Sequence, residues 1–451
     1  MACEPVYEAS APHSFMESKQ LTTPLMLGKI CRLWRHIVFH CPRLWNVIFL
    51  ELRSEPQVYK TQLELLESWL SRSGDLLLSI HLDQLEREPA GWVDNPPVEV
   101  FDLLAGYSHR WLHVTTFLVR PCWEDLEKLS LPSLTTLAVR PPGDADSATE
   151  LREAIWRISC APSLRNAYFV MFYKVGMELP MHQLTQITIK SCIWQDRLSL
   201  LASAPNVVHC SILDLRSHFS DNHQAIIALP YLSSLTVGSL RGALLIARIF
   251  NCIVDSEPLA SIGTFLSRSS CSLRELSLKV THFEERSEQA LITMLADMES
   301  LEKLELGCKR GGKFGPVFYH LNPARPQHTP QYLPSSRVVL PNLRCFRYKG
   351  PMAFEIPHLT RMIDMRYRMS RVDEEKNSEL EPVGRQGNHN RIARPESFDI
   401  EILEMKRDRC STTLCDYADT LERLMEEHEG VTFSVFDERD YNKSIQGLMT
   451  G

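Results

Sequence analysis

A short pattern recurs eight times between residues 131 and 348, and it constrains the fold more than any other feature of the chain. Each copy has a proline or another helix-breaking residue, an apolar anchor, two mostly polar residues and an alternating apolar pair. The anchors are Leu134, Leu164, Leu184, Val207, Leu232, Leu273, Leu301 and Leu343. Most intervals between anchors are 20 to 30 residues, enough for one strand and one return. A unit this short buries no core alone, so the pattern predicts stacked units that share one core.

Apolar and polar residues alternate after each anchor. In the copy that begins at Leu301, Leu304 and Leu306 point to one side and Glu305 to the other, which indicates a strand with one buried face. Between strands, residues 287–298 repeat apolar side chains at helical spacing. We therefore expect an α/β fold, a leucine-rich-repeat-like solenoid with a curved parallel sheet and helical returns. An ordinary α/β sheet protein with leucine-rich strands is the alternative.

The chain divides into segments of different composition. In order, we expect a disordered N-terminus (1–20), a partial helical unit (21–52), a connecting helix with the first strands (53–120), the solenoid (121–368), a charged loop or linker (369–397), a strand-helix-strand cap (398–440) and a flexible tail (441–451). Glycine and proline recur at 307–339, which predicts an insertion within the solenoid, and Phe314-Gly315-Pro316 is expected to prevent a helix there. In the cap, Gly430 lies where a helix would end.

Composition favours an interaction protein inside the cell. The 451 residues are 44% apolar and carry a net charge of −7, which does not suggest a nucleic-acid partner. The cysteines include no Cys-x-x-Cys pair, so zinc and redox motifs find no support, and we expect Cys31, Cys192 and Cys252 to be buried thiols. The sequence indicates no signal peptide and no stretch that would span a bilayer. We expect a cytoplasmic or nuclear location.

The sequence lacks the common catalytic motifs. It has no Gly-x-Ser-x-Gly elbow, no Gly-x-x-x-x-Gly-Lys-Ser/Thr loop and no His-Glu-x-x-His. His81, His109 and His113 occur singly, without spacing that would bring two catalytic groups together. Residues 309–313 are basic and glycine-rich, but no helix N-terminus that could hold a phosphate is predicted after them. We therefore expect no catalysis, no cofactor and no bound metal.

A small helical unit precedes the repeats. Thr22-Thr23-Pro24 predicts a helix start, and Cys41-Pro42 predicts the helix end. Apolar residues of this helix recur on one side, at Ile30, Cys31, Trp34, Ile37 and Val38. Residues 44–50 are typical of a strand. Trp34 and Trp45 in so small a unit indicate either a tight local core or a docking surface, and taken alone they favour the core.

This unit resembles a known family. Residues 30–37, Ile-Cys-Arg-Leu-Trp-Arg-His-Ile, followed by Pro-Arg-Leu-Trp at 42–45, resemble the second half of the F-box in fungal F-box-like proteins from mushrooms. Two further elements of that family are similar to residues 66–74 and to Ser-His-Arg-Trp at 108–111. The Leu-Pro-x-Glu-Ile/Leu helix that opens an F-box has no counterpart in residues 1–20. The N-terminal half of the F-box is therefore missing from the resemblance.

The resemblance implies a substrate-recognition subunit of a cullin-RING ubiquitin ligase, which is not itself catalytic. A Skp-type adaptor would bind the N-terminal unit through Leu27, Ile30, Cys31, Trp34, Ile37, Pro42, Leu44 and Trp45. A protein substrate would bind along the concave strands through the outward residues Thr136, Thr188, Thr236, Ser277, Glu305 and Arg347. The alternative is a non-catalytic leucine-rich-repeat scaffold that has lost ligase docking.

Overall fold

The structure is a computed structural model, and it describes residues 24–52, 56–84, 98–117, 128–140, 155–158, 160–170, 176–190, 200–213, 227–240, 258–282, 285–310, 315–324, 338–352, 354–378, 392–404 and 417–437. The expected disordered N-terminus and flexible tail lie outside these residues, as do positions 379–391 of the predicted charged loop.

Thirteen strands form one open sheet in which every neighbouring pair is parallel. Their spatial order follows the chain: β1 (Val47–Leu52), β2 (Leu78–Gln84), β3 (Trp111–Phe117), β4 (Thr136–Arg140), β6 (Asn166–Val170), β8 (Gln186–Lys190), β9 (His209–Leu213), β10 (Ser234–Leu240), β11 (Glu275–His282), β12 (Lys303–Arg310), β13 (Cys345–Pro351), β14 (Ser397–Glu404) and β15 (Val431–Asp437). Two short strands, β5 (Ile155–Arg157) and β7 (Gly176–Glu178), pair separately. The predicted α/β class and parallel sheet are confirmed.

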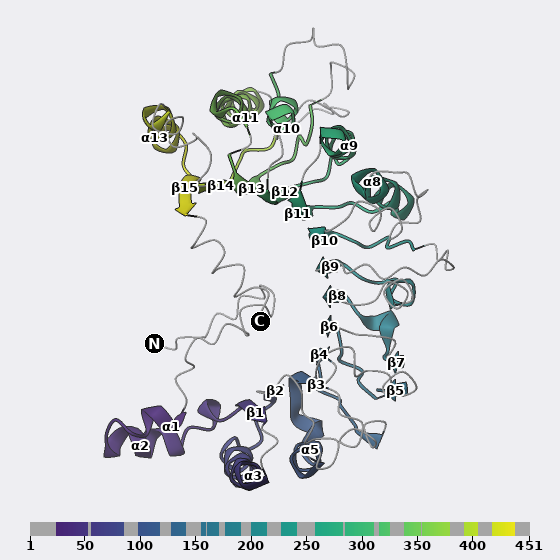
Figure 1. Ribbon diagram of the computed structural model, residues 1–451, viewed down its shortest axis with the longest axis vertical. Helices are drawn as coiled ribbons and strands as arrows, with labels where there is room; N and C mark the ends of the chain where they lie inside the picture. Colours follow the sequence, from purple (N-terminus) through teal and green to yellow (C-terminus); the bar gives the residue numbers. More distant parts are fainter. Residues whose placement is uncertain are drawn as a thin grey trace.

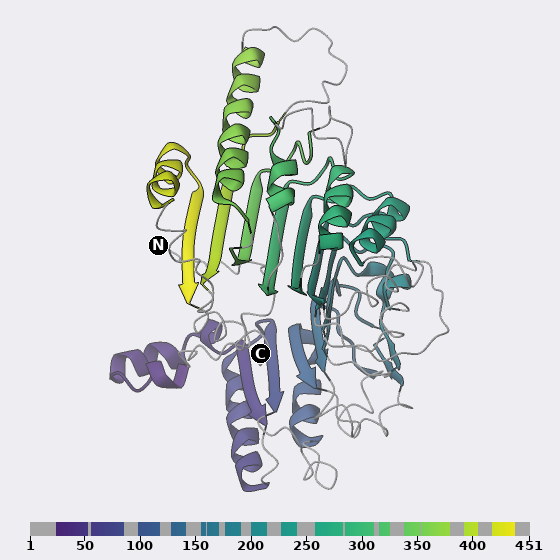
Figure 2. The same ribbon diagram turned by 45° about the horizontal axis from the view of Figure 1, so that its top comes forward.

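The sheet curves into an arc, with strands on the inner side and helices on the outer side (Figure 1). The helices are α1 (Pro24–Leu27), α2 (Arg32–Phe39), α3 (Pro56–Arg72), α5 (Val98–Ala105), α8 (Pro258–Ser269), α9 (Glu285–Ala296), α10 (Gly315–Leu321), α11 (Ile356–Ser378) and α13 (Ala418–Glu427), with 3-10 turns η2 (Pro42–Leu44), η3 (Ser108–Arg110) and η8 (Met181–Gln183). Helices α1 and α2 project from the β1 end of the arc (Figure 2). None of the helices in the described ranges is long and apolar enough to cross a membrane.

The core lies between the sheet and the outer helices and turns. All eight predicted anchors are at most 3% exposed, and so are Leu304 and Leu306 of β12. They belong to one continuous cluster of buried apolar side chains that extends from Ile48 to Val431. Consecutive strands therefore contribute to a single shared core, as expected for units too short to bury a core of their own.

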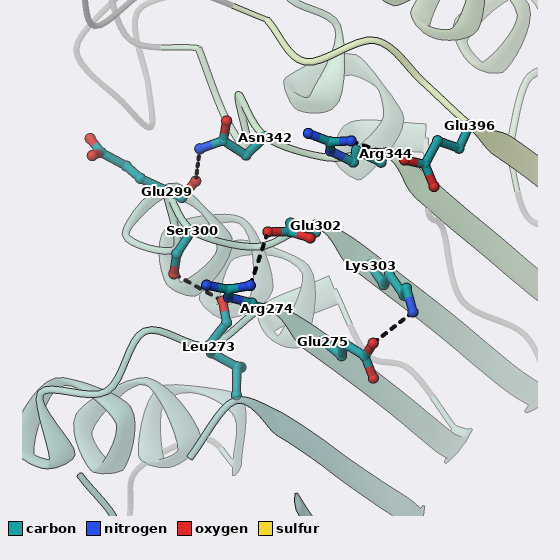
Figure 3. Close-up of polar contacts among 10 residues, drawn as sticks. All are labelled: Leu273, Arg274, Glu275, Glu299, Ser300, Glu302, Lys303, Asn342, Arg344 and Glu396. Atoms are coloured by element: carbon teal, nitrogen blue, oxygen red, sulfur yellow. Dashed lines mark hydrogen bonds and ion pairs between the residues drawn. The ribbon is translucent and has the colours of Figure 1, made fainter. Parts of the chain in front are cut away.

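The residue before an anchor joins its turn to the preceding one. Ser300 Oγ donates to the Leu273 carbonyl at 2.9 Å, and Asn342 Nδ2 donates to the Glu299 carbonyl at 2.8 Å (Figure 3). The same bond recurs earlier in the chain from Ser163, Gln183 and Asn206 to the carbonyls of Pro132, Ala161 and His182. These side chains donate to backbone carbonyls that lie outside the strand pairing, so they link each turn to the preceding one.

Two sequence predictions about helices are wrong. Gly315 and Pro316 begin helix α10 instead of preventing it, because a proline in the first turn gives up an N–H that has no helical partner there. Helix α11 continues to Ser378, ten residues into the segment predicted as a loop from 369 onward. The segment expected to form the cap contains β14, α13 and β15, with Gly430 at φ +86° just before β15.

A buried arginine connects α11 to the segment before β13. Arg366 is 0% exposed and donates hydrogen bonds to three backbone carbonyls, those of Leu321, Val339 and Leu340, at 3.1, 2.7 and 3.0 Å. Burial lowers its pKa to about 10. The three carbonyls belong to backbone that no strand pairs, and one side chain donates to all of them.

Candidate protein-binding surfaces

The N-terminal unit consists of two short helices and not of one continuous helix. Residues Gly28 to Cys31 separate α1 from α2, and Cys31 has extended backbone at φ −160° as the N-cap of α2. Its Sγ accepts a hydrogen bond from the Trp34 backbone N–H at 3.5 Å, and Arg35 Nε donates to the Gly28 carbonyl at 3.0 Å. Cys31 is exposed, so its prediction as a buried thiol is wrong. Cys192 and Cys252 lie outside the described residues.

One side of this unit is anchored on α3. The Trp45 indole is 1% exposed, and its ring meets that of Trp69 edge-on, with centroids 4.8 Å apart. The Arg72 guanidinium lies 4.3 Å from the Phe39 ring centroid and 4.9 Å from that of Trp45. Trp69 Nε1 donates to the Val47 carbonyl at 3.1 Å, which ties α3 to β1 as well. These contacts hold α2 in a fixed position beside the first strand.

The other side of the unit is apolar and faces solvent. The described residues expose fourteen large hydrophobic side chains, and seven of them belong to this unit: Leu25, Met26, Ile30, Leu33, Trp34, Ile37 and Phe39. Trp34 is 44% exposed, so the prediction that both tryptophans belong to a local core is wrong for Trp34. It is correct for Trp45, which is 1% exposed. We call Leu25, Met26, Ile30, Leu33, Trp34 and Ile37 the N-terminal apolar face. A gathering of this kind is typical of a surface that binds another macromolecule.

The eight predicted adaptor-binding residues divide by exposure. Ile30, Cys31, Trp34, Ile37 and Pro42 are exposed, Leu27 and Leu44 are half-buried, and Trp45 is buried. Trp45 and Leu44 therefore support the surface without forming it. The sequence prediction missed Leu33, which is 66% exposed and lies three residues after Ile30 and four before Ile37. That helical spacing was the signal that could have found it.

The second candidate surface is the inner face of the sheet, which we call the concave face. Because the strands pair in step, their outward residues form straight rows across it. One row runs through Thr188, Ser211, Thr236, Ser277, Glu305, Arg347 and Asp399, and it contains five of the six predicted substrate contacts. Thr136 lies in the adjacent row and accepts a 3.2 Å hydrogen bond from Asn166 Nδ2. Thr188 is only 5% exposed, which leaves little of it for a partner.

From β11 to β14 the concave face is lined by opposite charges on neighbouring strands. The pairs are Glu275–Lys303 at 2.7 Å, Lys279–Glu305 at 3.3 Å, Arg347–Asp399 at 3.4 Å and Lys349–Glu401 at 2.7 Å. Just before these strands, Arg274, Glu302, Arg344 and Glu396 alternate in sign (Figure 3), with Arg274–Glu302 at 3.9 Å and Arg344–Glu396 at 3.0 Å. Each charge is satisfied across a strand boundary, so the surface is charged yet locally balanced.

Hydrogen bonds hold these charges in place. Ser277 Oγ donates to Glu305 Oε2 at 2.7 Å, and Thr432 Oγ1 donates to Asp399 Oδ1 at 2.7 Å. Burial opposes the ionisation of Glu275, but the hydrogen bond and charge of Lys303 outweigh it and lower the pKa of Glu275. The same hydrogen bond raises the pKa of Lys303. Both groups therefore stay charged over a wider pH range, and this part of the face keeps its pattern of charge.

At the other end of the sheet the concave face carries two neutral histidines. Burial, followed by the neighbouring charge of His113, lowers the pKa of His81 to about 4. Burial also lowers the pKa of His113, whose Nδ1 lies 3.3 Å from Thr135 Oγ1. Their spacing in the sequence did not indicate this proximity, which arises because the register of β2 and β3 places them diagonally across one strand boundary. A lowered pKa keeps both imidazoles uncharged at neutral pH.

The two surfaces offer different chemistry to a partner. The N-terminal apolar face suits the apolar side of another protein, and the concave face offers polar groups and charges in fixed positions. No protein-family model matches this chain, and a search of curated proteins gave no match. The functional argument therefore rests on these two surfaces and on the residues that hold them.

Proposed function

We propose that this chain is the substrate-recognition subunit of a cullin-RING ubiquitin ligase, of the F-box type and without catalysis of its own. Its N-terminal unit would be an F-box remnant that binds a Skp-type adaptor, and the sheet would be a leucine-rich-repeat-like solenoid that binds a protein substrate. Such a subunit works in the cytoplasm or the nucleus. The observation that carries the proposal is the N-terminal apolar face, which is exposed on a unit whose other side is firmly packed.

The packing of the unit supports docking through helix α2. Leu33, Trp34 and Ile37 follow helical spacing on α2 and are all exposed, and the exposed Ile30 lies in the turn just before the helix. Exposing these side chains costs solubility and gains nothing for folding, whereas a partner helix or groove would bury them. Because Trp45 and Arg72 already fix α2, little conformational entropy would be lost on binding.

The concave face supports the capture of a protein and not of a small molecule. Its outward residues extend across all thirteen strands in rows, and the charged part spans β11 to β14. Paired charges held by hydrogen bonds give a partner a fixed pattern to match, which favours specificity over affinity. Ser277, Glu305 and Arg347 are the predicted substrate contacts in this part, and they lie on adjacent strands.

The second candidate function is a leucine-rich-repeat scaffold that binds proteins without a ligase. It uses the same concave face and needs no adaptor. The two functions differ only in what covers the N-terminal apolar face, so one binding experiment separates them.

The test is capture of a purified Skp-type adaptor, with and without its cullin, by the purified chain. Two variants accompany the parent: Ile30→Asp with Trp34→Asp in the apolar face, and Tyr231→Asp as a control on another exposed aromatic side chain, 63% exposed. We expect the parent and the Tyr231 variant to bind the adaptor equally and the double variant to lose binding at least tenfold.

Melting temperatures of all three proteins establish that they are folded. Adaptor capture by neither the parent nor the control, with both folded, would reject the ligase function and leave the scaffold. Equal capture by the double variant would show that the adaptor binds elsewhere and would remove the N-terminal apolar face from the proposal.

A further inference from the structure

Helices α11 and α13 lie side by side at the β15 end of the sheet (Figure 1), and three potential metal ligands meet between them. Asp364 comes from α11, Glu427 is the last residue of α13 and His428 follows it. One ligand atom from each lies within 4.8 Å of the other two. We propose that these residues form a binding site for a divalent transition-metal ion, with Zn²⁺ as the preferred metal.

The buried histidine is the observation that points to a ligand. His428 is 4% exposed, and neither of its ring nitrogens has a hydrogen-bond partner within the described part of the chain. Its Nε2 points to Asp364 Oδ1 from 3.5 Å, which is too long for a good hydrogen bond. A buried polar group without a hydrogen bond costs free energy, so an unfilled partner is expected at Nε2.

The distance between these two atoms suits a shared ion. Zinc binds nitrogen and oxygen ligands at about 2.0–2.2 Å in tetrahedral geometry, which places two ligands about 3.4 Å apart. The 3.5 Å separation of His428 Nε2 and Asp364 Oδ1 matches this value. Glu427 is exposed, so its carboxylate can rotate to supply the third ligand. Water would take the remaining position.

Contacts with Tyr367 fix the orientation of His428. The Tyr367 ring stacks on the His428 ring, with centroids 4.3 Å apart and planes 10° from parallel, so the imidazole is held in one orientation. Tyr367 also donates a 2.8 Å hydrogen bond to the Glu429 carbonyl, which fixes the backbone just after His428. One imidazole with two carboxylates favours zinc over magnesium, which prefers oxygen ligands alone.

Two arginines compete for the carboxylates. Arg368 Nε lies 2.8 Å from Asp364 Oδ1, and Arg423 Nε lies 3.7 Å from Glu427 Oε1. Both arginine side chains are more than 60% exposed, so they can swing away when a doubly charged ion arrives. A bound ion would then tie α11 to the end of α13 and stabilise the open edge of the sheet at β15. This role does not depend on the proposed ligase function.

The test uses the full chain, freed of metal with a chelator and titrated with ZnCl₂ by calorimetry. Glu427→Gln and Asp364→Asn remove one ligand each, and Glu355→Gln makes the same change of charge at a 77% exposed position near the start of α11. We expect one Zn²⁺ per parent chain, unchanged affinity in the Glu355 variant and affinity at least about tenfold lower in each ligand variant. Zn²⁺ should also raise the melting temperature of the parent.

Glu427 is exposed, so its variant keeps the test valid even if the Asp364 variant fails to fold. No saturable Zn²⁺ binding by the parent would overturn the site. Equal binding by the parent and the Glu427 variant would assign the zinc to other ligands, such as the exposed thiols of Cys31 and Cys160, and would overturn it as well. A matching affinity for MgCl₂ would overturn the choice of metal.

Discussion

The indole nitrogen of Trp45 donates a 2.8 Å hydrogen bond to the backbone carbonyl of Val38. Val38 is 0% exposed and Trp45 is 1% exposed, so this bond is shielded from water. It gives one of the last carbonyls of α2 a second donor beside the Cys41 backbone N–H, which lies 3.3 Å away. The bond thus fixes the C-terminal end of α2, while Trp34, one helical turn before Val38, is 44% exposed and open to a partner.

The two tryptophans should respond differently to truncation. We expect Trp45→Ala to lower the free energy of unfolding by about 3–5 kcal/mol, because it empties a buried site and removes the indole hydrogen bond to the Val38 carbonyl. Trp34→Ala should change it by less than about 1 kcal/mol, because its ring is already largely in water. Urea denaturation followed by circular dichroism measures both. A large loss in the Trp34 variant would contradict the exposed position of its ring.

Gly430 cannot carry a side chain in its present conformation. Its φ is +86°, and a Cβ there would collide with the Glu396 carbonyl oxygen, while its own carbonyl accepts a 2.9 Å hydrogen bond from the Phe398 N–H. We expect Gly430→Ala to destabilise the protein by more than about 1 kcal/mol. Gly74→Ala is the matched control, because Gly74 also has positive φ, at +56°, but nothing lies within 4 Å of its Cβ position. Equal losses in thermal melts would show that the collision has no cost.

Much of the fold could be predicted because the sequence signal is local and repeated. A sequence pattern that recurs many times produces the eight anchors, the alternation at Leu304 and Leu306, and the parallel sheet. Helix α10 was missed because Gly315 and Pro316 break a helix interior yet can begin one. The extent of α11 was missed because its last turns carry charged residues, which are equally compatible with a loop.

The candidate sites were harder to predict. The stripe of Ile30, Trp34 and Ile37 has the same spacing whether it packs on the protein or faces a partner, so the sequence could not choose between them. Asp364 and His428 lie on different elements and meet only in the folded chain. His81 and His113 likewise become neighbours through strand register. No short sequence motif reveals which distant residues become neighbours in the folded chain.

The buried guanidinium of Arg366 should be essential for stability. Arg366→Met keeps an extended apolar side chain but removes every donor, so the carbonyls of Leu321, Val339 and Leu340 each lose their hydrogen bond to the guanidinium. We expect a loss of about 3–5 kcal/mol in the free energy of unfolding. Arg361→Met, at an exposed position of the same helix, should cost less than about 0.5 kcal/mol. Similar urea midpoints for the two variants would refute the role of Arg366.

The low pKa of His81 predicts how stability depends on pH. In the folded protein this pKa is about 4, and in the unfolded chain it returns toward its ordinary value of 6.5. Above pH 6.5 neither state binds a proton at His81, so its contribution to stability is fully present. As the pH falls from 6.5 toward 4, the unfolded chain takes up a proton that the folded protein does not, and the folded state loses stability.

We expect the parent to lose roughly 1–3 kcal/mol more than His81→Gln between pH 7 and pH 4.5. The variant keeps a polar side chain of similar size but cannot titrate, so it corrects for the carboxylates that titrate over the same range. Urea denaturation at half-unit pH steps gives both curves. Because burial also lowers the pKa of His113, some pH dependence should remain in the variant. Curves that run parallel would mean that His81 does not bind its proton differently in the two states.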